Sequence, residues 1–219
     1  MANANKKLKQ NEQRIEEEAQ KELALQAEKR KKENRKTYIG LVLRALLYAV
    51  IYTCLTLLLG KINIGGFNFS YGMFQCRLTE AMMGLVFFDP AAAPGIILGC
   101  FVSDCLGPGG LYDAMVGTVA SFFGYYFIKF VAERGMKPWA GLLMHALMNA
   151  IMLGVMFGYT EAYGSYGMLV AFGAVFIGEL ISAVGGGMLV YKIGSRSWED
   201  ILSETEKSKE PQPDPSEML

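Results

Sequence analysis

The sequence has few of the residues from which enzymes build catalytic centres. It contains one histidine, His145, and its four cysteines show no CxxC or Cys/His spacing typical of a metal site. The HExxH pattern of zinc hydrolases and the GxSxG pattern of serine hydrolases are both absent. A nucleophile with its base, or a metal cluster, therefore has little support. We expect a protein that is not an enzyme and that has no resident metal or cofactor.

Charge is also scarce over most of the chain. Hydrophobic residues make up 52% of the sequence and charged residues only 19%, and the charges gather in residues 1–36 and 196–219. The net charge of zero therefore averages over a charged head, an apolar body and an acidic tail. The apolar segments lack the polar face that helices of a soluble domain show. We predict an all-α integral membrane protein of the cell membrane, with a membrane domain over residues 37–195.

The apolar body divides into six predicted membrane spans. A helix needs about 20 residues to cross a hydrocarbon core of about 30 Å. The candidate spans are 38–59, 76–88, 90 or 93–106, 111–131, 139–157 and 166–193. The second is too short to cross alone and is expected to begin within the outer half of the membrane. Basic residues, including a cluster over 29–36 that would touch anionic lipid, favour one face and predict that both termini are cytoplasmic.

Ionisable residues lie at membrane depth in two places. Arg77 and Glu80 open the hydrophobic segment FQCRLTEAMMGLVFF, and Glu179 lies deep inside the last apolar run. A charge at this depth costs roughly 3 kcal/mol or more, so it usually faces a protein interior or a watery cavity and marks a substrate or ion site. These residues are therefore the starting point for a functional hypothesis.

Several motifs follow one another in an order that resembles a known family. They are the Arg-x-x-Glu-Ala opening at Arg77, a Pro-Gly-containing apolar segment that ends in Gly-Cys-Phe, a Gly-Gly-Leu-x-Asp stretch that ends at Asp113, and the later segments MNAIMLG and IGELISAVGGGMLVYK. Over roughly residues 38–195 this order is similar to the QueT family. Members of that family are substrate-binding S components of energy-coupling factor (ECF) transporters, and they are assigned to queuosine precursors.

The resemblance implies an architecture and a set of partners. It implies a six-helix bundle with both termini inside, which captures a small solute from outside and works with a transmembrane coupling subunit and ATPase subunits. The absence of a GxxxxGK[ST] loop agrees with ATP hydrolysis by partners. An AxxxA pair, Ala45 and Ala49, matches the face that docks on the coupling subunit, although packing within the bundle is the alternative. The chain departs from the family in its longer head and tail, and in having Asp104 where Asn is more frequent.

The implied substrates, 7-deazaguanines such as preQ1 and preQ0, place demands on a pocket. A guanine-like edge presents an N–H and an amino group in parallel, which a carboxylate can accept together. The ring needs aromatic or apolar walls, and the aminomethyl cation of preQ1 needs a second acid or an aromatic face. The expected binding residues are Glu80, Arg77, Glu179, Asp113, Asn149 and Asp104, together with a covering loop that contains Phe67, Phe69, Tyr71 and Phe74.

Two of these acids also have structural interpretations. Glu80, the leading candidate, could instead form an ion pair with Arg77 three residues away on one helix face. Glu179 could be a satisfied carboxyl that bonds to Asn149 or Thr118 of a neighbouring helix.

The remaining polar candidates have similar alternatives. Asp113 could be the N-cap of the fourth span, and Asp104 could be a solvated helix end. Asn149 could join helices, and His145 is interpreted as a packed polar residue.

Four functions therefore compete. The favoured one is uptake of a queuosine precursor, with no role for nucleic acid. The alternatives are uptake of another vitamin or nucleobase by the same architecture, an intramembrane enzyme, and a membrane adaptor whose charged head recruits a soluble partner.

Overall fold

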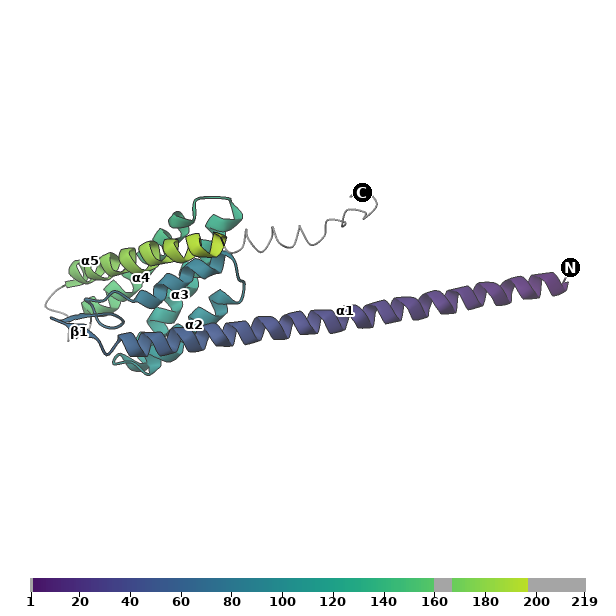
Figure 1. Ribbon diagram of the computed structural model, residues 1–219, viewed down its shortest axis with the longest axis horizontal. Helices are drawn as coiled ribbons and strands as arrows, with labels where there is room; N and C mark the ends of the chain where they lie inside the picture. Colours follow the sequence, from purple (N-terminus) through teal and green to yellow (C-terminus); the bar gives the residue numbers. More distant parts are fainter. Residues whose placement is uncertain (1, 160–166, 197–219) are drawn as a thin grey trace, which may run out of the picture. The chain divides into compact units, whose positions relative to one another are not determined.

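The computed structural model describes residues 2–159 and 167–196, and these are almost entirely helical (Figure 1). The chain forms two compact units, Met1–Leu43 and Arg44–Leu219. Helix α1 (Ala2–Leu59) contributes to both. Most of the polar tail predicted for 196–219 lies outside the described residues.

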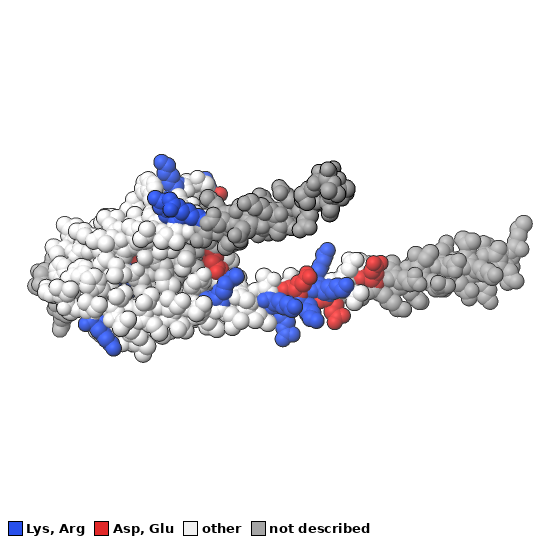
Figure 2. Space-filling model, in the orientation of Figure 1, with Lys and Arg blue, Asp and Glu red and all other residues white. Residues whose placement is uncertain are grey.

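The first unit consists of the charged part of α1. Its composition, rich in Glu, Lys, Gln and Ala, favours a helix. Acidic and basic side chains are intermingled on its described surface (Figure 2). A side-chain bond from Thr37 Oγ1 to the Glu33 carbonyl, 3.1 Å long, closes one turn near its end.

The second unit contains the remaining elements. In chain order these are β1 (Asn63–Ile64), β2 (Phe67–Asn68), the 3₁₀ helix η1 (Leu78–Phe87), α2 (Ala92–Cys105), α3 (Gly110–Glu133), α4 (Pro138–Tyr159), α5 (Gly167–Glu179) and the π-helix η3 (Leu180–Gly186). The two strands form an antiparallel hairpin whose turn residues, Gly65 and Gly66, both have positive φ, as a tight hairpin turn requires. This hairpin is the one departure from the predicted all-α class among the described residues.

Four helices are long and apolar enough to cross a membrane. They are Glu28–Leu59, Gly110–Glu133, Pro138–Tyr159 and Gly167–Arg196, and the shorter apolar helices are Leu78–Phe87 and Ala92–Cys105. The structure therefore agrees with six helical segments, of which four have the length of a span. At 14 residues α2 is only about 21 Å long, so the predicted third span is too short to cross the hydrocarbon core alone.

The short helix η1 lies in the middle of the second unit. It packs against α2, α3, α4 and η3, while α4 packs between α3 and α5. One core cluster joins η1 to α2, α3 and α4 through Met83, Ile96, Ile128 and Leu142. The visible outer surface of this unit is almost free of charge, which fits a helix bundle in contact with lipid (Figure 2).

Helices α1 and α2 approach each other closely. A Cβ atom added at Gly95 would meet the Ala45 carbonyl oxygen, and one added at Gly99 would meet the Ala49 carbonyl oxygen at 2.9 Å. The hydroxyl of Thr53 donates to the Gly99 carbonyl at 3.2 Å across the same contact. Small residues on α2 thus let the two backbones touch.

Candidate functional site

A cluster of ionisable side chains is buried around η1. The buried acidic, basic and histidine residues among those described, none more than 7% exposed, are Arg77, Glu80, Asp104, Asp113, His145 and Glu179. They come from the residue before η1 and from η1, α2, α3, α4 and α5, so the fold brings together polar residues that are far apart in the sequence. In an otherwise apolar bundle such a gathering indicates a functional site.

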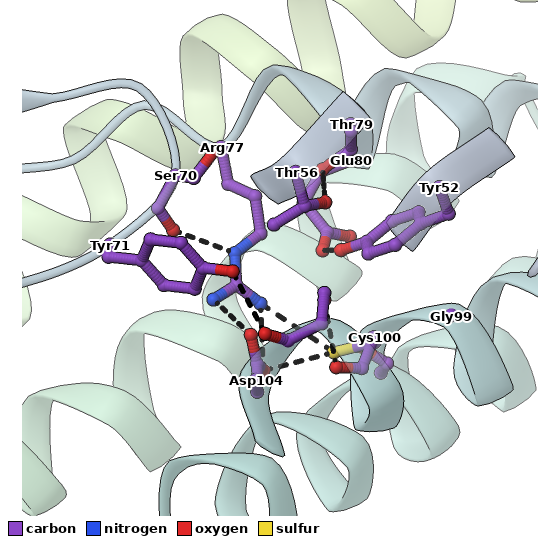
Figure 3. Close-up of polar contacts among 12 residues, drawn as sticks. Tyr52, Thr56, Ser70, Tyr71, Arg77, Thr79, Glu80, Gly99, Cys100 and Asp104 are labelled. Carbon is purple, nitrogen blue, oxygen red and sulfur yellow. Dashed lines mark hydrogen bonds and ion pairs between the residues drawn. The ribbon is translucent and has the colours of Figure 1, made fainter. Parts of the chain in front are cut away.

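Arg77 and Asp104 form an ion pair in which both carboxylate oxygens accept hydrogen bonds (Figure 3). Arg77 donates from Nη2 to Asp104 Oδ1 at 2.9 Å and from Nη1 to Oδ2 at 3.1 Å, while its Nε donates to the Ser70 carbonyl at 3.1 Å. The predicted alternatives for these residues are therefore wrong: Arg77 does not pair with Glu80, and Asp104 is no solvated helix end. The pair ties the loop before η1 to α2.

Glu80 projects from η1 to neighbours on two other helices. Its Oε1 accepts from the Tyr52 hydroxyl of α1 (Figure 3), and its Oε2 lies 2.9 Å from His145 Nε2 of α4. Asn149 Nδ2 lies 3.0 Å from the same ring nitrogen. The tautomer of His145 decides which of these contacts Nε2 makes: with a proton it donates to Glu80, and without one it accepts from Asn149. Both Glu80 oxygens thus have contacts within the protein.

Glu179 is the buried acid whose bonding is incomplete. It ends α5, is 3% exposed, and its Oε2 has no hydrogen-bond partner. The predicted alternative, a bond to Asn149 or Thr118, is not found, and Thr118 Oγ1 is itself buried without a partner. A carboxylate oxygen of Glu179, one of Glu80 and a ring nitrogen of His145 all lie within 4.8 Å of one another. Glu179 therefore points into the cluster.

Among the described residues, Glu80, His145 and Glu179 form the group that could hold a metal ion. Two carboxylates and one imidazole are suitable ligands for zinc or a similar divalent ion. However, Glu80 and His145 are already hydrogen-bonded to each other, and Tyr52 occupies the second Glu80 oxygen. A metal bond of about 2.0–2.2 Å to Glu80 Oε2 and His145 Nε2 would require the hydrogen bond between them to break, whereas the Tyr52 bond to Oε1 could remain.

The loop between α1 and η1 covers one end of the cluster. The Tyr71 hydroxyl donates to the Ser103 carbonyl at 2.9 Å, and the Arg77 guanidinium lies 5.8 Å from its ring centre. Burial raises the pKa of the Tyr71 phenol to about 12, so it stays protonated at physiological pH. Met73 of the same loop packs against Ala150 and other residues of α4 and α5.

A small cavity lies over this covering loop. Its volume is about 230 Å³, and its lining residues include Asn63, Asn68, Tyr71, Met73 and Phe74. Phe67 and Phe69 stack edge to face with ring centres 5.4 Å apart, while Phe74 is 43% exposed. Of the predicted aromatic residues, Tyr71 contacts the charged cluster through Arg77.

Glycines of α3 make room for the buried charges. A Cβ atom at Gly117 would meet Asp104 Oδ2 at 2.7 Å, and one at Gly124 would overlap His145 Nδ1. Asp113, in the first turn of α3, is not its N-cap as the alternative predicted, because that position belongs to Gly109. Asp113 is instead 7% exposed and points toward the end of the bundle where Gly109 lies.

Sequence reasoning missed two residues of the site. Tyr52 was not considered, and His145 was interpreted as simple packing, yet both hold Glu80. A signal existed for each. His145 and Asn149 are four residues apart on one helix face, and Tyr48, Tyr52 and Thr56 form a polar row on an otherwise aliphatic helix.

Comparison with known families gives one match. A family model described as the QueT transporter matches residues 41–195, which is more than half of the chain. No curated protein and no solved structure matches.

Proposed function

This chain belongs to the QueT transporter family, and from that premise we propose that it is the substrate-capture subunit of an ECF-type importer. Membership and the apolar helices make it a multi-pass membrane protein of a transport family rather than an enzyme. In the proposal it binds a queuosine precursor, a 7-deazaguanine such as preQ1 or preQ0, from outside. A transmembrane coupling subunit and ATPase subunits then drive delivery inward.

One observation carries this proposal: the buried polar cluster is incompletely bonded. Buried polar atoms are almost always hydrogen-bonded, because each unsatisfied one costs about 1–3 kcal/mol. The described buried side-chain atoms without a partner are Ser70 Oγ, Gln75 Oε1, Thr118 Oγ1, His145 Nδ1 and Glu179 Oε2. A flat polar heterocycle would supply hydrogen bonds to such atoms.

The chemistry of the cluster suits a guanine-like base. Carboxylate and amide oxygens accept the parallel donors of the base, and an amide N–H can donate to its carbonyl. Glu179 and Gln75 have unpartnered oxygens, Asn149 lies in the proposed site with its amide against His145, and Glu80 is bonded to Tyr52 and His145. In this proposal the guanine edge lies among these side chains, and Tyr71 and Met73 close the site above it.

The direction of capture follows from the predicted topology. The hairpin β1–β2 lies at the end of the bundle where α5 begins (Figure 1). With both termini cytoplasmic, as the basic residues predict, this end faces outside. The cavity over Tyr71 and Met73 would then be the external opening, and the loop would move when solute binds.

The coupling subunit is expected to contact α1. Ala45 is half-buried and Ala49 is buried, and α2 touches the backbone of both. This contact does not test whether their small side chains also admit a partner helix. A bulky substitution, Ala45→Leu, separates the two roles: under this proposal it lowers uptake in cells with the coupling subunits and leaves solute binding by the purified chain unchanged.

Equilibrium binding to the purified full chain tests the proposed function. The panel contains preQ1, preQ0, guanine and an unrelated vitamin. We expect measurable affinity for at least one 7-deazaguanine and competition between such bases. Affinity for the vitamin alone would mean that the same architecture transports a different solute. No affinity for any 7-deazaguanine would refute the proposal.

A further inference from the structure

The described interior contains more carboxylates than cations. Glu80, Asp104, Asp113 and Glu179 carry up to four negative charges, against one positive charge from Arg77, or two if His145 is protonated. Surplus negative charge is costly in a medium of low dielectric constant unless the acids take up protons or a cation pairs with them. The interior is therefore suited to receive positive charge.

The pairing of these groups shows where that charge is missing. The guanidinium nitrogens of Arg77 donate to Asp104 and to the Ser70 carbonyl, so no pair of them is left to bind another carboxylate. Glu80 accepts from Tyr52 and contacts His145 with its other oxygen. None of the ion pairs found among the described residues involves Glu179 or Asp113. Asp113 lies beside Gly109 at the end of the bundle, whereas Glu179 lies next to Glu80 and His145 and has a buried oxygen without a partner.

The backbone around Glu179 is unusual as well. The α-helix changes to a π-helix at the next residue, Leu180, and π segments inside helices are frequent at functional sites. Gly178 lies directly against the backbone carbonyl of Gln75, so the end of α5 packs on the loop that precedes η1. Glu179 is thus held at the centre of the bundle with one oxygen free.

We propose that Glu179 is the counter-charge for a cationic group on the solute, so that the site selects a base with an aminomethyl group over its uncharged analogue. This inference rests on the proposed function. The ammonium donates a charge-assisted hydrogen bond to the free Glu179 oxygen, which a nitrile cannot do. Glu80 has a positioning role: it holds His145 and Tyr52.

A solute cation fits this place better than a metal ion does. It can use the unpartnered oxygen of Glu179, whereas a metal held by Glu80 and His145 through the same two atoms would have to break the hydrogen bond between them. Elemental analysis of the purified chain tests this point. One equivalent of a divalent metal that is lost in Glu179→Gln would overturn the assignment to a solute cation.

The main test compares two ligands and three proteins. PreQ1 carries the aminomethyl cation and preQ0 a neutral nitrile on the same ring, so their affinities are measured for the wild type, Glu179→Gln and Glu133→Gln. Glu133 is a matched acid on the surface of α3, 63% exposed. We expect the wild type and Glu133→Gln to prefer preQ1 by about tenfold or more, and Glu179→Gln to lose that preference through weaker preQ1 binding.

Each outcome has a distinct meaning. Equal wild-type affinity for preQ1 and preQ0 overturns the inference and leaves the proposed function standing, and this result does not depend on any variant folding. Equal weakening of both ligands by Glu179→Gln also overturns it, because Glu179 would then bind the shared ring or support the structure. If neither base binds the wild type, the proposed function itself fails.

Discussion

Arg77 and Asp104 show what a buried charge requires at the level of single side chains. Both are at most 4% exposed, and the guanidinium and the carboxylate meet through two parallel hydrogen bonds. Such a pair adds little net stability over an apolar substitute, but removing one partner leaves the other buried and uncompensated. Glu179 is already buried without a compensating partner, which is why we interpret it as a ligand group.

Replacing Arg77 with methionine should therefore destabilise the protein strongly. Asp104 would be left buried without a cation, and the free energy of unfolding should fall by about 3–5 kcal/mol. Thermal unfolding in detergent measures this. The matched control is Lys129→Met, which removes an exposed pair with Glu133 and should cost no more than about 1 kcal/mol. Equal effects of the two substitutions would contradict the account of this pair.

Tyr71 gives a prediction about alkaline pH. Its pKa rises from 10.0 to about 12 because the phenol is buried. The folded state therefore keeps this proton more tightly than the unfolded state, so the contribution to stability is complete below pH 10 and is lost as the pH rises toward 12. Tyr71→Phe should remove this part of the pH dependence and cost about 1 kcal/mol at pH 7, since the bond to Ser103 is lost. An unchanged pH profile in the variant would contradict the assignment.

The sequence identified the ionisable residues but not their pairing. Charges inside apolar segments stand out, so Arg77, Glu80 and Glu179 could be recognised without a structure. Their partners depend on how helices pack, and helical spacing within one segment suggested the wrong partner for Arg77. The polar spacing on their helices marks His145 and Tyr52 as candidates, but only the packing of the bundle shows that both lie against Glu80.

Among the secondary-structure elements, η1 and α3 determine the geometry of the site. The short η1 carries Glu80 into the centre, and α3 leaves space at Gly117 and Gly124 for side chains from α2 and α4. A glycine in a helix costs stability relative to alanine, so its presence where it faces a buried polar group has a packing reason. Here the reason is the room needed by Asp104 and His145.

Gly124→Ala tests this arrangement. The added methyl group would overlap the His145 ring and displace it from Glu80, so we expect a loss of about 1–3 kcal/mol in stability and weaker solute binding. Gly173→Ala on α5 is the control, because no atom lies within 4 Å of its added Cβ. That variant should be neutral or slightly stabilised. Normal binding by Gly124→Ala would show that the position of His145 is unimportant.

The long helices could be predicted from hydropathy, whereas the irregular ones could not. The fourth and fifth spans were expected within one or two residues of α3 and α4 at each end, because apolar composition marks a membrane helix directly. The 3₁₀ geometry of η1 and the π segment after Glu179 arise from tertiary packing, which leaves no periodic signal in the sequence.

At the scale of the whole molecule, the chain combines a charged helical unit with a membrane unit. The family match begins at residue 41, close to the division between Leu43 and Arg44. The polar groups proposed to bind the solute all belong to the second unit. The first unit is therefore expected to be dispensable for solute capture.

Deleting residues 1–34 tests this division. We expect the shortened chain to bind preQ1 with the affinity of the full chain, because none of the proposed ligand groups is removed. Uptake in cells that contain the partner subunits should also persist. If uptake is lost while binding stays normal, the charged unit has an adaptor role of its own.

The most direct test of the central claim is an experimental structure of the full chain with preQ1 bound. The account predicts that the base lies among η1, α4 and α5 and that its ammonium lies about 2.7–2.9 Å from a Glu179 oxygen. A base bound elsewhere, or a Glu179 side chain turned away from the base toward a neighbouring helix, would contradict it.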